Sequence, residues 1–245
     1  MLHAAQCSLH GIPGVCCLVD DAFEKLLQNP RVWRGRAQAK SRQGLSSGYP
    51  KLDQCLPGGG WPRHALTEIL LEYYGTGELK LLMPALARLS QPRDHAEQAG
   101  WIAWIAPPFE PYPPALRQWG VNLSRILIVR PRQATEILWA AEQALSSGNC
   151  AAVLLWADSF DDTAGRRLQL AAEKGQSWAI AFRSLKALGQ VSAAALRLRL
   201  MAGELGADLS ILKSRGGRPA VIRDYAGCRN DFDHEYQFAR PDRYT

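Results

Sequence analysis

The chain has 245 residues, of which 47% are hydrophobic and 21% are charged, the balance of a globular protein with a full core and one sizeable α/β domain. It holds no run of about 18 apolar residues, and no basic start followed by a long apolar stretch, so neither a transmembrane helix nor a signal peptide is expected. The net charge of +6 favours acidic partners or nucleic acid only modestly.

The six cysteines are scattered and include no Cys-x-x-Cys pair. Cys16 and Cys17 are adjacent, an arrangement that would be hazardous in an oxidising compartment. Cysteines that behave as small apolar residues fit a reduced environment. The sequence therefore predicts a cytoplasmic protein.

The first 43 residues form a predicted N-terminal arm, helical and then basic. Asp21–Leu27 has the pattern of a short helix with one apolar face, and Asn29-Pro30 should end it. A helix this short must dock on something, and tryptophan and arginine dominate binding hot spots. The residues predicted to bind a partner, or a second copy of the chain, are Phe23, Leu26, Leu27, Trp33, Arg34 and Arg36.

Residues 44–223 are predicted to be the core, an α/β domain with a parallel sheet flanked by helices. The predicted strands are Ala65–Leu70, Trp101–Ala106, Arg125–Arg130, Ala152–Ala157 and Trp178–Phe182. The predicted helices span about residues 79–89, with Pro84 as a kink, then 116–119, 134–147 and 164–172. Continuous apolar strands separated by helices indicate a parallel sheet that is covered on both faces.

The pattern changes after the fifth strand. Leu196–Leu200 alternates strictly, much of Asp208–Lys213 does the same, and Gly216-Gly217 leads into Ala220–Arg223. Alternation with short turns predicts a C-terminal antiparallel meander with one solvated face, and it assigns Arg197 and Arg199 to that face. Residues 224–245 are polar and aperiodic and are expected to be a flexible tail.

Several residue types could be mistaken for functional sites. Most tryptophans lie within predicted strands or helices, where core packing is expected: Trp101, Trp104, Trp139, Trp156 and Trp178. The glycines at 58–60 precede a strand, and a plain turn is expected. No Gly-x-Ser-x-Gly elbow is present, and the acidic and histidine residues near 231–235 have no distant partner ligands. We therefore predict no metal, no cofactor and no catalytic residue.

The segment Gly44–Ile69 resembles the stretch that leads into the nucleotide site of RecA-family recombinases. It contains Ser-Ser-Gly, Leu-Asp, Gly-Gly-Gly-Trp-Pro and a strand with Glu68-Ile69. Trp119-Gly120-Val-Asn, a strand, and a helix that ends in Ser147-Gly148 repeat the order and spacing of that family. The likeness runs over about residues 22–223, and it implies a RecA-like fold.

A phosphate-binding loop of that family reads Gly-x-x-x-x-Gly-Lys-Ser/Thr, in which glycine amides cradle the phosphates, lysine neutralises them and the hydroxyl ligates magnesium. Here Leu71 stands in place of the first glycine, Gly77 in place of the lysine, and Glu78 in place of the hydroxyl residue. Thr76, directly before Gly77, belongs to the same region. The loop is therefore degenerate.

Two further positions of the family's nucleotide site are also vacated. Pro108 stands where the family has its catalytic glutamate, and Trp156 stands where it has the Walker-B aspartate, although Asp158 follows two residues later. Phosphate clamping, water activation and metal ligation all lack their residues. The resemblance thus predicts a protein that neither binds nor hydrolyses ATP and is not an enzyme.

A degenerate RecA-like chain of this kind is similar to the ImuA family and to the SulA family. The shared segments are Gly77–Leu86, Trp104–Pro108 and Ser147–Trp156. The intact lead-in at 57–62 and a meander that runs on to Arg215-Gly-Gly-Arg-Pro favour ImuA.

The ImuA resemblance implies an accessory protein of SOS-induced translesion DNA synthesis. Its partners would be an ImuB-like Y-family protein, RecA and a DnaE-type error-prone polymerase. The alternative is a SulA-like division inhibitor that binds FtsZ, and an active RecA-type ATPase is a weaker one. Any DNA contact is expected to be weak and non-specific, through Lys213, Arg215 and Arg218.

Overall fold

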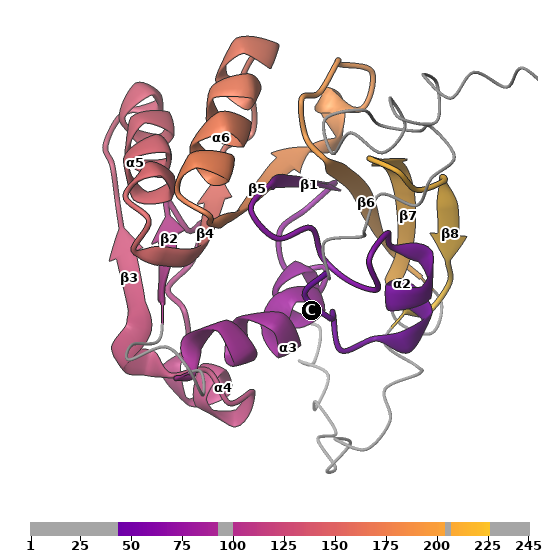
Figure 1. The fold of residues 1–245 in the computed structure, drawn as a ribbon, viewed down its shortest axis with the longest axis horizontal. Coiled ribbons are helices and arrows are strands. Elements are labelled where there is room, and N and C mark those ends of the chain that lie inside the picture. Colours follow the sequence, from indigo (N-terminus) through magenta and orange to yellow (C-terminus); the bar gives the residue numbers. More distant parts are fainter. Residues whose placement is uncertain (1–43, 93–99, 204–206, 226–245) are drawn as a thin grey trace, which may run out of the picture. The chain divides into compact units, whose positions relative to one another are not determined.

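The computed structural model describes residues 44–92, 100–203 and 207–225. They form a mixed eight-stranded sheet with helices on both faces (Figure 1), which confirms the predicted α/β class. The predicted arm of residues 1–43 lies outside the described residues, as does the tail from residue 226 onward.

The strands follow one another in the spatial order β3-β2-β4-β5-β1-β6-β7-β8. Their bounds are β1 Leu66–Leu71, β2 Trp101–Ile105, β3 Ile126–Val129, β4 Cys150–Trp156, β5 Trp178–Ser184, β6 Leu196–Ala202, β7 Ala207–Ser214 and β8 Ala220–Ile222. All pairs from β3 to β6 are parallel, whereas β7 is antiparallel to β6 and β8 is antiparallel to β7. The parallel strands are joined by helical crossovers because a short turn cannot link them.

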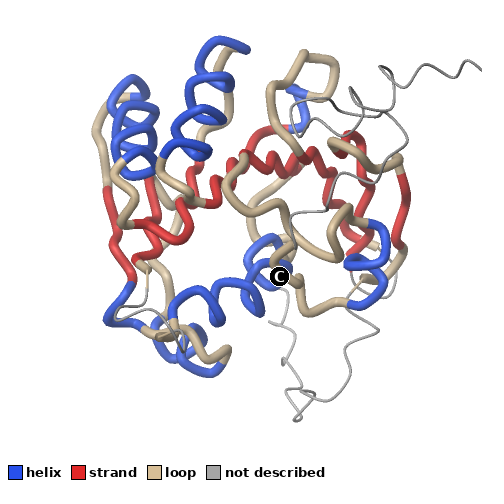
Figure 2. The backbone as a smooth tube through the Cα atoms, in the orientation of Figure 1, coloured by secondary structure: helices blue, strands red, loops and turns tan. Residues whose placement is uncertain are grey.

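The helices divide between the two faces of the sheet. They are α2 (Pro50–Cys55), α3 (Glu78–Ser90), α4 (Pro113–Gln118), α5 (Ala134–Ser146) and α6 (Asp162–Lys174), with single 3₁₀ turns η1 (Leu123–Arg125) and η2 (Leu185–Ala187). Figures 1 and 2 show α5 and α6 on one side and α3 and α4 on the other. The sequence analysis missed α2, which starts on a proline in its first turn, where the missing N–H costs nothing.

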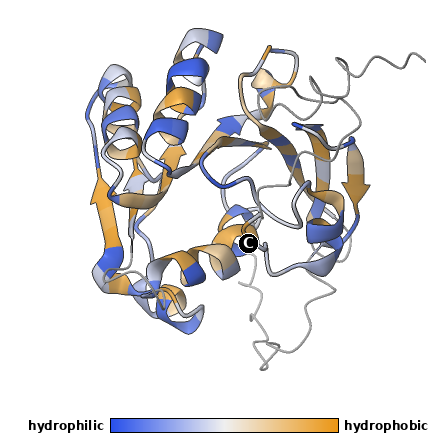
Figure 3. Cartoon of the chain, viewed as in Figure 1, coloured by the Kyte–Doolittle hydropathy of each residue, from blue (hydrophilic) through white to orange (hydrophobic). Residues whose placement is uncertain are grey.

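Side-chain alternation along the strands builds a core layer on each face. In β1, Leu66 packs in the layer that includes residues of α5 and α6, whereas Ile69 packs in the layer that includes residues of α3. Hydrophobic residues accordingly concentrate in the strands and on the inward sides of the helices (Figure 3).

The tryptophan predictions are right for three residues and wrong for two. Trp104, Trp156 and Trp178 are buried, and the Trp178 indole Nε1 donates to Thr67 Oγ1 at 3.0 Å. Trp101 and Trp139, however, are 38% and 62% exposed. Membership of an element does not say which face a residue takes: Trp139 points away from the buried Ala141 stripe of α5, and Trp101 is the first residue of β2.

Candidate functional site

The candidate nucleotide site lies where strands β1 and β4 end. Leu71 is the last residue of β1 and is buried, and residues 72–77 form the loop into α3. Gly77 caps α3 with a φ of 97°, a left-handed backbone that favours glycine, and Glu78 is the first helical residue. The carboxyl ends of parallel strands are where α/β proteins hold ligands, so the predicted loop has the right position for a nucleotide.

The carboxylate of Glu78 turns back onto this loop. The amide N–H of Gly75 donates to both of its oxygens, at 2.8 and 3.1 Å, and the residue is only 5% exposed. An anion at a helix N-terminus is stabilised by the helix dipole and by the free amides of the first turn. The place that suits a phosphate therefore already holds a carboxylate of the chain itself.

A second contact closes the loop against the end of β4. The hydroxyl of Tyr74 donates to Oδ1 of Asp158 at 2.5 Å. Burial raises the pKa of Tyr74 well above its ordinary value, and the bond to Asp158 and the charges of Asp158 and Glu78 raise it further. Asp158, the acid nearest to the vacated Walker-B position, is thus engaged by a protonated tyrosine.

The loop is also tied to the end of the described chain. The Tyr225 hydroxyl donates to the carbonyl oxygen of Gly77 at 3.1 Å, and its ring meets Tyr49 edge-on with centroids 5.1 Å apart. Burial raises the pKa of Tyr225, with Tyr49 and Glu78 adding to the effect. A third tyrosine contact joins Tyr49 to the first turn of α3, through Lys80 O at 2.9 Å.

Trp156, which the sequence analysis aligned with a Walker-B aspartate, lies in a cluster of aromatic side chains. Trp156 ends β4 and is buried, stacked on Phe182 with centroids 4.7 Å apart and tilted against Trp104 at 5.5 Å. Pro108 is exposed just beyond β2. Neither side chain can ligate a cation or activate water, so these positions contribute packing and loop geometry.

A cluster of buried charged side chains lies on three neighbouring strands at the centre of the sheet, β5, β1 and β6. The sequence analysis missed it. Glu68 of β1 lies between Arg183 of β5 and Arg197 of β6, with Nη1 of Arg183 3.2 Å from its Oε1 and Nε of Arg197 3.0 Å from its Oε2. The three side chains are 1%, 2% and 7% exposed, respectively. Burial lowers the pKa of Arg197, as does the Arg183 charge, while Glu68 opposes them.

This burial corrects the assignment of Arg197 and Arg199 to a solvated strand face. Arg197 is buried and Arg199 is partly buried. Alternation shows that polar and apolar side chains take opposite faces of a strand. It does not show that the polar face is solvated, because a neighbouring strand can supply a carboxylate that pairs with a buried arginine. The signal that could have found the cluster is Glu68 itself, a lone acid inside a fully apolar strand.

The cluster holds the segment between β5 and β6. Arg197 donates to the carbonyl oxygens of Gln190 at 2.7 Å and of Ala187, and Arg183 donates to Gln190 Oε1 at 2.9 Å. Arg183 also donates to Phe160 O at 2.8 Å and lies 3.9 Å above the Phe160 ring. The buried arginines thus hold two loops in one arrangement.

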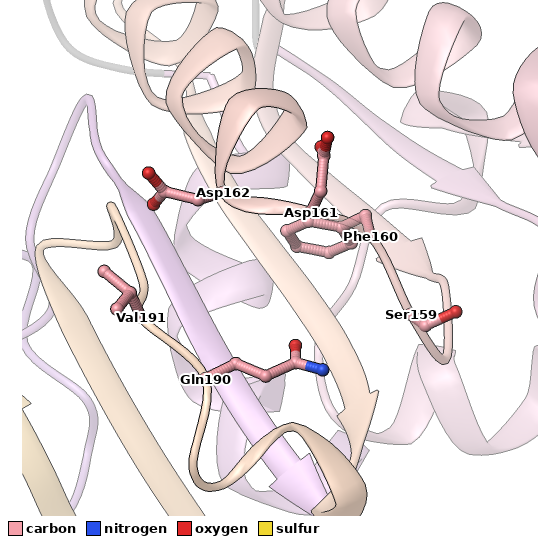
Figure 4. Close-up of a pocket in the computed structure, with 6 residues that line it drawn as sticks. All are labelled: Ser159, Phe160, Asp161, Asp162, Gln190 and Val191. Atoms are coloured by element: carbon pink, nitrogen blue, oxygen red, sulfur yellow. The ribbon is translucent and has the colours of Figure 1, made fainter.

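An open pocket of about 530 Å³ lies between those two loops. Figure 4 shows Phe160, Asp161 and Asp162 on the segment that enters α6, facing Gln190 and Val191 on the other segment. Asp161 caps α6 by accepting from Ala164 N at 2.8 Å, and Asp162 pairs with Arg166 at 2.8 Å. The two acids therefore serve the helix start.

The residues predicted to contact nucleic acid lie at the other end of the sheet. Lys213, Arg215 and Arg218 are exposed near the β7–β8 turn, which is adjacent to the start of β6. Lys213 Nζ donates to Ser192 O at 2.6 Å, and Arg215 Nη1 is 3.6 Å from the Glu173 carboxylate. They share one edge, but two of the three already have protein partners.

The remaining predictions concern residues outside the described part of the chain, or kinds of site that the described part does not contain. The partner-binding residues Phe23, Leu26, Leu27, Trp33, Arg34 and Arg36 all lie outside the described residues. Among residues 44–92, 100–203 and 207–225, no group of histidine, cysteine and acidic side chains could hold a metal ion. In the same part of the chain no helix is long and apolar enough to cross a membrane.

Comparison with known proteins agrees with the motifs. The family model "Cell division inhibitor SulA" matches residues 67–179. Protein ImuA of Caulobacter vibrioides is 37% identical over 134 residues, 53% of each chain, and the cell division inhibitor SulA of Edwardsiella piscicida is 35% identical over 99 residues, 40% of this chain and 56% of that protein. The chain spans about half the length of the curated relatives it matches.

Among solved structures, SulA from Pseudomonas aeruginosa is 30% identical, with a TM-score of 0.40 over 48% of this chain and 97% of that one. The sequence matches show that the chain is similar to both ImuA and SulA. The resemblance to ImuA and to SulA that the motifs predicted is thus confirmed.

Proposed function

We propose that this chain is a non-catalytic accessory protein of the SOS response, with a RecA-like core in residues 44–223 that no longer uses a nucleotide. It acts in translesion DNA synthesis by binding proteins: an ImuB-like Y-family protein, RecA and a DnaE-type error-prone polymerase. The observation that carries the proposal is the Glu78 carboxylate on the Gly75 amide. A triphosphate would have to displace a stabilised anion and would meet no lysine there.

The direct test is calorimetry of the purified chain with ATP and magnesium. We expect no measurable heat of binding and no phosphate release. Gly77→Lys should not create activity, because Pro108 and Trp156 leave water activation and metal ligation empty. Micromolar, magnesium-dependent affinity for ATP would overturn the loss of nucleotide function.

The partner proposal has a separate test. Tagged chain should retain the ImuB-like protein and RecA encoded by the same genome, both with and without ATP. The predicted arm supplies the variants: deletion of residues 1–43, or Trp33→Ala with Arg34→Ala, should abolish association with RecA or with a second copy. Full-strength binding by the truncated chain, still folded by circular dichroism, would contradict a role for the arm.

The second candidate is a SulA-like inhibitor that binds FtsZ, and the SulA family match over residues 67–179 supports it. Expression of the chain in cells without DNA damage separates the two. Normal division favours the translesion role, whereas filaments that disappear when the chain is depleted favour the division inhibitor.

Direct DNA binding, if measured, should be weak. Each contact of Lys213, Arg215 or Arg218 with a phosphate would release about one counterion from the DNA. The affinity for DNA should therefore fall steeply between about 50 and 200 mM salt. Replacing all three by alanine should remove most of that salt dependence. Sequence-specific or salt-insensitive binding would be inconsistent with this contribution.

A further inference from the structure

Strand β3 ends the sheet in the described part of the chain. It pairs with β2 in parallel, with Ala103 opposite Leu127 and Trp104 opposite Ile128. The carbonyl oxygen of Val129 accepts from Ala106 N at 2.9 Å, so the peptide groups of residues 127 and 129 point toward β2. Because backbone groups alternate along a strand, the peptide groups of Ile126 and Ile128 do not bond to β2. The N–H of Ile126 already donates to the carbonyl oxygen of Leu123, which leaves the C=O of Ile126 and both groups of Ile128 for a further strand.

The side chains of this edge are apolar on both faces. Leu127 is 46% exposed and Ile128 is 40% exposed, on opposite faces, and Trp101 of β2 lies on the Leu127 face. Edge strands are normally protected by a charged residue, a proline or a bulge. The four residues of β3, Ile-Leu-Ile-Val, contain no charge and no proline.

Arginines flank this apolar edge. Arg125 precedes β3, with its guanidinium 5.5 Å from the centre of the Trp101 ring, and Arg130 follows it. Arg130 pairs with Glu110 at 2.6 Å, but both side chains are exposed, 50% and 77%, and exposed pairs exchange at little cost. The flanks can therefore offer positive charge to an incoming chain.

These flanks disfavour a second copy as the occupant. Because only Ile126 and Ile128 direct groups outward, two β3 strands could pair antiparallel only about Leu127 or Ile128. Arg125 would then lie opposite Val129 or Pro131, and Arg130 opposite Ser124 or Ile126, so a second copy brings no acidic residue to either arginine. A segment with acidic residues at its ends would instead meet an arginine at each end.

We propose that the β3 edge is a docking site for an extended segment of a partner protein, apolar in its middle and acidic at its ends, which adds to the sheet as a further strand. Main-chain bonds to the C=O of Ile126 and to the N–H and C=O of Ile128 supply affinity, as in other strand-addition complexes. Leu127, Ile128 and Trp101 select apolar side chains, and Arg125 and Arg130 select the ends. The inference rests on the proposed function only in that both require protein binding; nucleotide does not enter it.

The test uses the full chain and a fluorescent peptide of about eight residues, a common strand length, with alternating valine and threonine between acidic ends. Control peptides carry lysine ends or a central proline. We expect saturable anisotropy for the acidic peptide and loss of binding for both controls. Arg125→Glu with Arg130→Glu should weaken binding about tenfold and invert the preference for the ends of the peptide.

Two matched variants locate the site. Ile128→Lys should abolish peptide binding, whereas Val221→Lys, at the 68% exposed residue of the opposite edge strand β8, should leave it unchanged. Hydrogen exchange gives a readout independent of affinity. Bound peptide should protect the amide of Ile128 and leave those of Leu127 and Val129, which face β2, and of Ile126, which already donates to Leu123 O, as they were.

The opposing results are equally specific. No binding of the acidic peptide, equal binding of the lysine peptide, or equal loss in Val221→Lys would overturn the proposal. Sedimentation that shows a dimer in the wild type and a monomer in Ile128→Lys would assign the edge to a second copy instead. If the chain binds both the peptide and ATP, the β3 docking site stands and only the proposed loss of nucleotide function is wrong.

Discussion

The centre of the sheet and its β3 edge differ in whether their polar groups are paired within the protein. At the centre, Glu68 meets two arginines, and at the end of β1 the Glu78 carboxylate accepts from the Gly75 amide. At the edge, the peptide groups of Ile128 point away from the sheet beside exposed Leu127 and Ile128, and Arg130 is held only by an exposed pair with Glu110.

This difference shows where binding can take place. A site whose charges are already satisfied by the protein must lose those bonds before it takes a ligand, and the exchange gives little net free energy. An open strand edge loses bonds to water and, at Arg130, an exposed ion pair that exchanges at little cost. The region that resembles a nucleotide site is therefore the more closed of the two, and the edge is the more receptive.

Glu68→Gln should have the largest effect on stability. It leaves two buried arginines without their carboxylate, and breaking a buried pair by removing one partner costs about 3–5 kcal/mol. Urea unfolding followed by circular dichroism measures it. Arg166→Ala, which breaks the exposed pair with Asp162, is the control and should cost about 0–1 kcal/mol. Equal losses in both variants would mean that the central cluster is not specially dependent on its charges.

Glu78→Gln should destabilise the fold by about 1–2 kcal/mol, because it removes a charge-assisted bond to Gly75 N and an anion at the start of α3. Glu72→Gln, on the exposed part of the same loop, should change stability by less than about 0.5 kcal/mol. If Glu78→Gln acquires tight ATP binding, the carboxylate was the main barrier to nucleotide. We expect that it does not, since the clamp lysine is still missing.

Tyr74→Phe should cost about 1 kcal/mol at neutral pH, the worth of one hydrogen bond. Its pH dependence is more informative. The folded pKa values of Tyr74 and Tyr225 are raised, so their stabilisation is complete below the unfolded value of about 10 and is lost as pH rises above it. Urea midpoints measured from neutral to alkaline pH should fall above about pH 10, and less steeply in Tyr74→Phe. An unchanged slope would mean that Tyr74 is not protected from ionisation.

Ile128→Lys should have the smallest effect on stability, within about 0.5 kcal/mol, because exposed substitutions away from special features are nearly neutral. Its expected effect is on binding alone. A large loss of stability would show that the β3 edge is structural, and it would remove the contrast with the centre.

Some local predictions from the sequence succeeded because they depend on nearby residues. The apolar run at Trp178–Phe182 and the helical repeat after Leu79 each carry their own periodicity, and both elements are present as β5 and α3. The interpretation of residues 71–78 as a degenerate phosphate loop also depends on local positions such as Gly77 and Glu78, and it stays a prediction. The ImuA and SulA resemblance rests on such short segments and is confirmed by the matches.

What the sequence determined by itself is the α/β class, the order of its elements, and the relation to ImuA and SulA. Only the tertiary structure decided that Arg197 is buried against Glu68 and that Leu127 and Ile128 lie on an edge. The physical reason is that periodicity is a property of neighbours along the chain. Pairing of charges and exposure of an edge depend on residues more than 100 positions apart, such as Glu68 and Arg183 with a separation of 115, and on strand order, which no local pattern records.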